Sequence, residues 1–122
     1  MGRINNLEKD FIVSAYIDSL CAFNNALQDL RKAESTVALL AKFREAHEAR
    51  VAELGSMGEW HLAHQIEESR CSLDYARNNA FRAARDFVER AEKAEPLGIV
   101  SDFDLLATAR EMVDAVLSKL AQ

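Results

Sequence analysis

The chain has 122 residues, of which 49% are hydrophobic and 29% are charged, and its net charge is −5 at pH 7. It contains only four glycines and one proline, too few for the many turns of a β-sandwich or a doubly wound α/β fold. Its mild acidity argues against the basic face of a nucleic-acid-binding protein. The composition therefore predicts one helical domain over residues 1–122.

The first part of the chain predicts one long helix. No glycine or proline lies between Gly2 and Gly55, and a stripe of mostly apolar residues follows alternating steps of three and four, the spacing of a coiled-coil seam. We expect a single helix of about 48 residues that ends at Gly55. The alternative is a break near Ser35, which would cap a second helix and give a four-helix bundle. The seam residues are Ile12, Tyr16, Ser19, Phe23, Ala26, Leu30, Ala33, Val37, Leu40, Arg44, His47, Val51 and Leu54.

A helical hairpin follows at Gly55–Gly58. Gly55 can take the left-handed conformation that ends a helix. Ser56, with Glu59 three residues later, forms the sequence pattern of a capping box and predicts that a second helix starts at once. Because the two helices adjoin, they should run antiparallel as a tight hairpin.

The last helix is predicted to be short. Pro96 interrupts the second helix, and Ser101 is the expected cap of the third, with a hydrophobic staple between Val100 and Leu105. We expect this helix to lie beside the second one, completing an antiparallel bundle or coiled coil. Its seam residues are Phe103, Leu106, Arg110, Val113, Leu117 and Leu120.

The remaining signals concern cellular location. The apolar run of residues 11–17 is interrupted by Asp18 and lacks a cleavage site, so we expect neither a signal peptide nor a membrane span. Cys21 and Cys71 are the only cysteines. They are too few for a disulfide framework, and we expect both to be buried free thiols in a cytoplasmic protein.

Four residues near the hairpin are the candidate partner-binding site. Arg44 and His47 stand at seam positions where apolar residues are expected, so they either contact a partner or extend to solvent along their apolar stems. Val51 continues the same seam. Trp60, the only tryptophan, either fills the hairpin end or serves as an exposed interface anchor.

Two stretches near the hairpin resemble known families. Residues 44–55, which begin Arg44-Glu45-Ala46-His47, resemble a helix of ferritin-like four-helix proteins, although Arg44 stands where those proteins have the glutamate of a Glu-x-x-His motif. The resemblance implies a bundle that binds metal or a small ligand. Residues 58–73, which begin Gly58-Glu59-Trp60, are similar to the start of small helical flagellar export chaperones.

Histidine spacing allows one candidate metal site. His64 and Glu68 share one face of the predicted second helix, and counting back across the hairpin brings His47 near them, so the three could converge on a zinc ion. The alternative is that they are polar surface or interface residues. We expect no cofactor.

The sequence carries no catalytic signature: there is no nucleophile motif and no glycine-rich phosphate loop. We therefore expect a non-enzymatic protein-interaction module that binds and occludes or holds a partner protein, as an inhibitor, an antitoxin-like protein or an export chaperone does. We also expect it to form a homodimer and to bind neither nucleic acid nor membrane. The alternative is the ferritin-like bundle.

Overall fold

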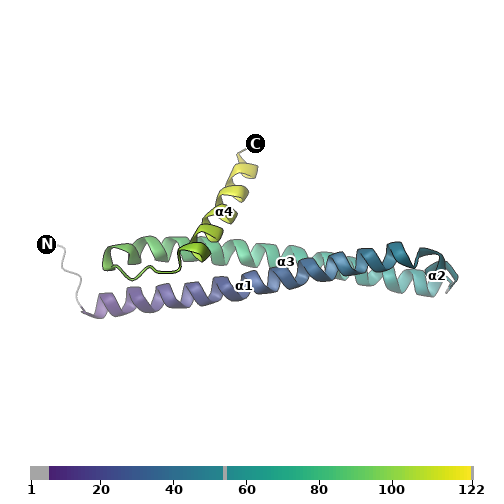
Figure 1. The fold of residues 1–122 in the computed structure, drawn as a ribbon, viewed down its shortest axis with the longest axis horizontal. Helices are drawn as coiled ribbons and strands as arrows, with labels where there is room; N and C mark the ends of the chain where they lie inside the picture. The colour runs from purple at the N-terminus through teal and green to yellow at the C-terminus, as the bar shows by residue number, and fades with distance from the viewer. Residues whose placement is uncertain (1–5, 54, 122) are drawn as a thin grey trace. The chain divides into compact units, whose positions relative to one another are not determined.

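The computed structural model describes residues 6–53 and 55–121, and among them it contains helices and no strand. The all-α class and the long N-terminal helix are thus confirmed. Ser35 lies inside the first helix, so the break required by the four-helix alternative does not occur. The elements are α1 (Asn6–Ala46), α2 (Glu48–Glu53), α3 (Ser56–Ala94), the 3-10 helix η1 (Glu95–Leu97) and α4 (Phe103–Leu120) (Figure 1).

The contacts within the chain form two compact units. Unit 1 consists of Met1–Leu27 and Asn79–Gln122, and unit 2 consists of Gln28–Asn78. Unit 1 therefore contains the first part of α1, the last part of α3, η1 and α4. Unit 2 contains the rest of α1, all of α2 and the first part of α3.

Aromatic rings form the centre of unit 1. Phe87 of α3 lies between Tyr16 and Phe23 of α1, with ring centroids 5.8 Å from it in both cases. Phe23 and Phe87 have no exposed surface. The other buried members of this cluster are mostly small, which lets the helices approach closely: Leu27, Ala84, Ala91, Ala94, Leu106 and Ala109.

The start of α4 agrees with the sequence to within one residue. The backbone N–H of Leu105 donates to the carboxylate of Asp102 at 3.4 Å, so Asp102 and not Ser101 caps the helix. Val100 and Leu105 are both partly buried against the core of unit 1, where the predicted staple places them.

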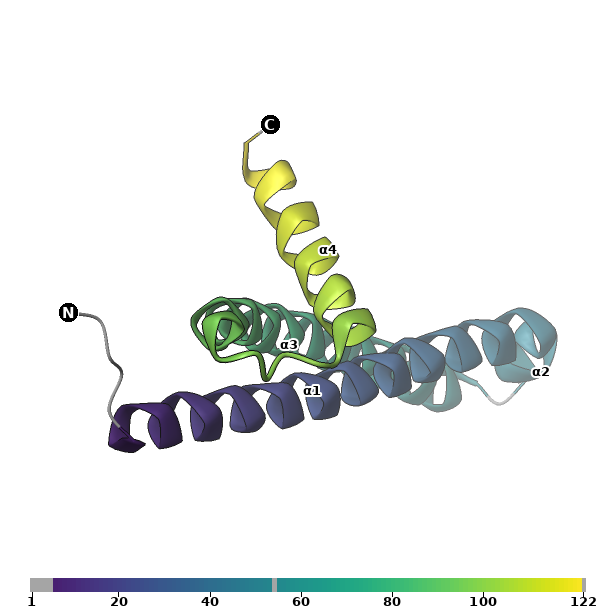
Figure 2. The same cartoon turned by 60° about the vertical axis from the view of Figure 1, so that its left-hand side comes forward.

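The path of α4 differs from the prediction. Its buried residues, Leu106 and Ala109, lie in its first half, whereas Leu117 and Leu120 near its end are 53% and 76% exposed. Within unit 1, α4 turns away from the segments of α1 and α3 instead of running along α3 (Figures 1 and 2). The expectation that the last helix lies beside the second is therefore wrong, because only its first turns carry the contact.

Unit 2 is a helical hairpin. Gly55 has a φ of +84°, the left-handed conformation predicted for it, and the N–H of Glu59 bonds its carbonyl at 3.2 Å. Ser56 is the first residue of α3, one position inside the predicted cap. The predicted long helix is interrupted by a turn at His47, yet the N–H of His47 still bonds the Phe43 carbonyl at 3.0 Å.

Burial in unit 2 is slight. The only buried residues among those described are Ser69, Leu73 and Ala76, all on α3. Val37 and Leu40, on the predicted seam of α1, are half-buried. The seam prediction therefore holds in unit 2, but it produces a thin core.

The predicted burial of the two cysteines is wrong. Cys21 and Cys71 are free, as expected, but both are exposed. Each lies two positions after a buried serine, Ser19 or Ser69. Two helical positions correspond to a rotation of about 200°, which turns the thiols away from the contact.

None of the helices within residues 6–53 and 55–121 combines the length and the apolar character needed to cross a membrane.

Candidate functional site

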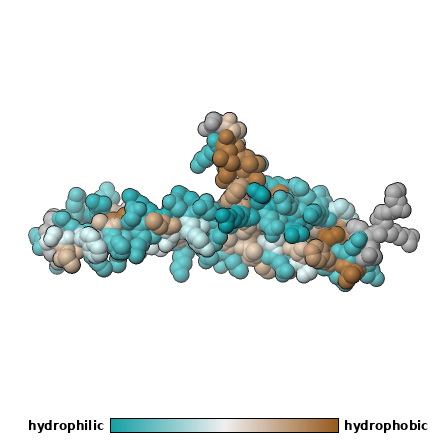
Figure 3. All heavy atoms as spheres, turned by 180° about the vertical axis from the view of Figure 1, so that it is seen from behind, coloured by the Kyte–Doolittle hydropathy of each residue, from teal (hydrophilic) through white to brown (hydrophobic). Residues whose placement is uncertain are grey.

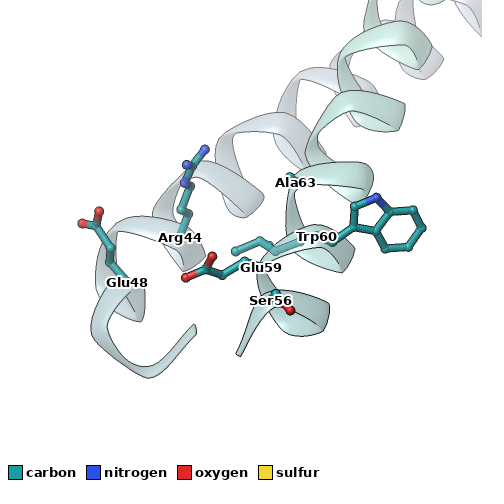
Figure 4. A pocket seen from close by; sticks show the side chains of 7 residues that line it. Arg44, Glu48, Ser56, Glu59, Trp60 and Ala63 are labelled. Carbon is teal, nitrogen blue, oxygen red and sulfur yellow. The ribbon is translucent and has the colours of Figure 1, made fainter. Parts of the chain in front are cut away.

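A groove of about 540 Å³ lies at the hairpin end of unit 2, and we call it the hairpin groove. Arg44 comes from the last turn of α1 and Glu48 from the first turn of α2, and the other side is formed by the first two turns of α3. Figure 4 shows the carboxylate of Glu59 directed toward the side of Arg44 and Glu48. The lining residues are Arg44, Glu48, Ser56, Glu59, Trp60, Leu62 and Ala63.

A second groove, of about 370 Å³, adjoins the first. The two share Arg44 and Glu48. Apolar residues of both helices line the second groove between charged ones, so the two hollows together offer apolar contact between charged rims. The residues of the second groove are Val37, Ala41, Arg44, Glu45, Glu48, Ile66 and Arg70.

Trp60 is exposed, and its indole stacks on the ring of a neighbouring histidine. Its side chain lies at the edge of the hairpin groove, and its indole points away from Arg44 (Figure 4). The indole is parallel to the imidazole of His64, with ring centroids 5.2 Å apart and an angle of 4° between the planes. His64 Nε2 in turn lies 3.2 Å from a carboxylate oxygen of Glu68. The residue is 60% exposed, so the expectation that it fills the hairpin end is wrong.

His47 lies on another part of the hairpin end. Its ring is 4.7 Å from that of Phe43, measured between centroids, and both residues are exposed. Among the predicted partner-binding residues, Arg44 and Trp60 thus line one groove, whereas His47 is not among the described residues that line it. The side chain of Val51 lies outside the described residues.

The three candidate metal ligands make contacts with different neighbours and do not converge on one point. His64 and Glu68 lie together on α3 and support Trp60, and His47 contacts Phe43. Among the described residues, no three histidine, cysteine, aspartate or glutamate side chains come close enough to hold a metal ion.

The charges of the site are exposed to solvent. The charged residues that line the two grooves are Arg44, Arg70, Glu45, Glu48 and Glu59, and all five are exposed. Water screens charges in such positions. The site is suited to reversible contact with another molecule.

The sequence did not lead us to expect the second groove or the stacking of Trp60 on His64. The spacing of Trp60, His64 and Glu68 in steps of four, which places them on one helix face, was a usable signal for the latter. Val37 and Ile66 carried no separate signal, because an apolar seam residue looks the same whether its partner helix covers it fully or partly.

Comparison of the chain with models of protein families, with curated proteins and with solved structures found no significant match.

Proposed function

We propose that this chain is a non-enzymatic, cytoplasmic protein-interaction module that binds a partner protein at the two grooves of unit 2 and acts as a homodimer. It occludes or holds that partner and needs no cofactor. One observation carries the proposal: an exposed tryptophan, held flat by His64, stands beside a groove that also contains Arg44.

Trp60 has the properties of an interface anchor. Tryptophan and arginine are enriched among the residues that contribute most to binding energy. Stacking on His64, which contacts Glu68, fixes the orientation of the indole before binding, so little side-chain entropy is lost on contact. An exposed, oriented indole is therefore ready to pack against a second protein.

The grooves fit an amphipathic helix of the partner. Leu62 and Ile66 are one turn apart on α3, and each lines one of the two grooves, which matches the spacing at which a bound helix presents its apolar side chains. The rims carry Glu45, Glu48 and Glu59 against Arg44 and Arg70. The excess of carboxylates favours a partner helix with basic residues beside its apolar face.

The makeup of the grooves supports a non-enzymatic role. Among the described residues that line them there is no histidine, the side chain that most often serves as general base near neutral pH and that activates a serine such as Ser56. The arginine and glutamate side chains present are exposed, which suits recognition.

Affinity capture from extracts of the native host tests the proposal with matched variants. The test chain carries Arg44→Ala and Trp60→Ala. The control carries Arg31→Ala and Tyr75→Ala, which also remove an exposed arginine from α1 and an exposed aromatic from α3 in unit 2, but outside both grooves. We expect one protein to be retained by the wild type and the control, and at least tenfold less of it by the test chain, about 1.4 kcal/mol or more of binding energy.

A third chain with His64→Ala isolates the support of the indole. It keeps Trp60 and Arg44, and we expect intermediate retention because the indole loses its fixed orientation. Equal retention by wild type, control and test chains would show that the grooves are not the docking site. Under the ferritin-like alternative, an iron titration would reach a stoichiometric end point, and we expect none.

A further inference from the structure

We infer that two copies of this chain pair through antiparallel α4 helices. The inference rests on the homodimer in the proposed function, and it assigns that homodimer to unit 1, whereas the partner grooves belong to unit 2.

The residues that the structure describes leave most of the seam predicted on α4 uncovered. Only Leu106 of that seam is buried, and Val113 is half-buried. Phe103, Leu117 and Leu120 are 66%, 53% and 76% exposed. Seen from behind, the end of α4 that projects from unit 1 is mostly hydrophobic (Figure 3). Within residues 6–53 and 55–121, no second helix therefore runs along the full seam of α4.

The core of unit 1 uses the neighbouring face of α4. Ala109 is buried there, and Leu105 and Met112 pack partly against the core. Given 100° per residue, the mean direction of Phe103, Leu117 and Leu120 is about 105° from this face. Leu106 and Val113 belong to both the seam and the core contact of unit 1, so a second helix would mainly cover Phe103, Leu117 and Leu120.

Charge selects the antiparallel orientation. In a parallel pair in register, Arg110 would face Arg110 of the second copy inside an apolar seam, and like charges there are unfavourable. In an antiparallel pair centred between Glu111 and Met112, Arg110 faces Val113 of the second copy. Asp114 of the second copy then follows directly, which gives the guanidinium an opposite charge.

The same register fills a groove of unit 1. It places Leu117 and Leu120 of one copy opposite Leu106 and Phe103 of the other. Those two residues line a groove of about 260 Å³ at the start of α4. Each copy thus offers both the exposed leucines and the groove that receives them, as a two-fold interface requires. The groove is lined by Ala91, Glu95, Gly98, Val100, Phe103, Leu106 and Arg110.

Light scattering on the purified chain gives the first test. We expect the wild type to have the mass of two chains, and a Leu117→Glu, Leu120→Glu variant the mass of one at the same concentration. The matched control, Ala115→Glu with Ser118→Glu, adds the same charges on the opposite face of α4, and it should remain a dimer. Circular dichroism checks folding, which should persist because all four positions are exposed.

Disulfide trapping tests the orientation. In chains with Cys21→Ser and Cys71→Ser, one sample carries Phe103→Cys and another Leu120→Cys. The antiparallel register predicts cross-linked dimers in a mixture of the two samples and few in either alone. Cross-linking of each sample with itself would indicate a parallel pair and overturn the proposed register.

These experiments distinguish a failure of the α4 interface from a failure of the homodimer itself. A wild-type dimer that persists in the Leu117→Glu, Leu120→Glu variant overturns the assignment to α4 but leaves a homodimer in place. A wild-type monomer overturns both the assignment and the homodimer. Neither result affects partner capture at Arg44 and Trp60, which is measured separately.

Discussion

The two units contain parts of the same two long helices, yet they use them differently. Unit 1 has two aromatic side chains with no exposed surface, Phe23 and Phe87, and a third helix in its core. Unit 2 has no fully buried large side chain among those described. Each unit buries one serine, Ser19 or Ser69, whose hydroxyl donates to the carbonyl three residues earlier.

Under the proposed function, the same helix pair stabilises the fold in unit 1 and binds a partner in unit 2. In unit 1 the seam between α1 and α3 is filled with rings and alanines, although Leu7, Phe11 and Ile17 on other faces of α1 are 80%, 67% and 51% exposed. In unit 2 the seam reaches Arg44 in the last turn of α1 and His47 just after it, and both are exposed. Leu62 and Ile66 remain half-exposed at the grooves. The apolar surface left open there is what a partner protein can bury.

The largest expected effect is in the core of unit 1. Replacing Phe87 by alanine removes the ring that contacts both Tyr16 and Phe23. We expect a loss of about 3–5 kcal/mol in the free energy of unfolding, measured by urea denaturation at fixed chain concentration. A loss below 1 kcal/mol would mean that these rings do not form the core.

A matched pair of leucines tests the contrast between the units. Leu106 is buried in unit 1 and Leu62 is half-buried in unit 2. We expect Leu106→Ala to reduce the free energy of unfolding by about 2–5 kcal/mol, and Leu62→Ala by about 1 kcal/mol because less apolar surface is returned to water. Equal losses in the same urea experiment would contradict the thin core of unit 2.

The hairpin turn should show a smaller effect. Gly55 has a positive φ, and nothing lies within 4 Å of a methyl group added there. An alanine would therefore be disfavoured by its backbone conformation alone, by roughly 1–2 kcal/mol. Gly98→Ala is the matched control in unit 1, with a φ of +70° and equally open surroundings. Thermal melts of both variants should shift by similar amounts, and an unchanged Gly55→Ala melt would argue against a left-handed residue at the hairpin.

The smallest expected effect is a gain in stability, and it concerns Tyr16. The hydroxyl of Tyr16 is buried without a hydrogen-bond partner in the described part of the chain. Because burying an unpaired hydroxyl is unfavourable, Tyr16→Phe should raise the free energy of unfolding by about 1 kcal/mol. Leu27→Met, a similar-sized change in the same core, serves as the control. A loss of stability in Tyr16→Phe would reveal a partner for the hydroxyl.

The sequence predicted the helices and breaks well, because these depend on local chemistry. The steps of three and four identified the buried Tyr16 and Phe23, and Gly55 and Pro96 marked the two interruptions. Each cap was misplaced by one residue, since adjacent polar residues such as Ser101 and Asp102 compete for the same role.

The direction of α4 and the exposure of Trp60 could not be predicted in this way. A regular apolar seam indicates that a helix packs against another helix, but it does not show whether that second helix belongs to the same chain. For α4, the close contact at Ala109 lies on a face beside the predicted seam. Trp60 fitted both a buried and an exposed role, and its 60% exposure distinguishes them.

Site-specific photo-crosslinking in the native host tests the central claim most directly, with a photoreactive phenylalanine analogue in place of Trp60 and mass spectrometry of the product. The account predicts a crosslink to one protein other than this chain, and none when the analogue replaces Tyr75. A product containing only two copies of this chain, or the same products from both positions, would contradict partner binding at the hairpin groove.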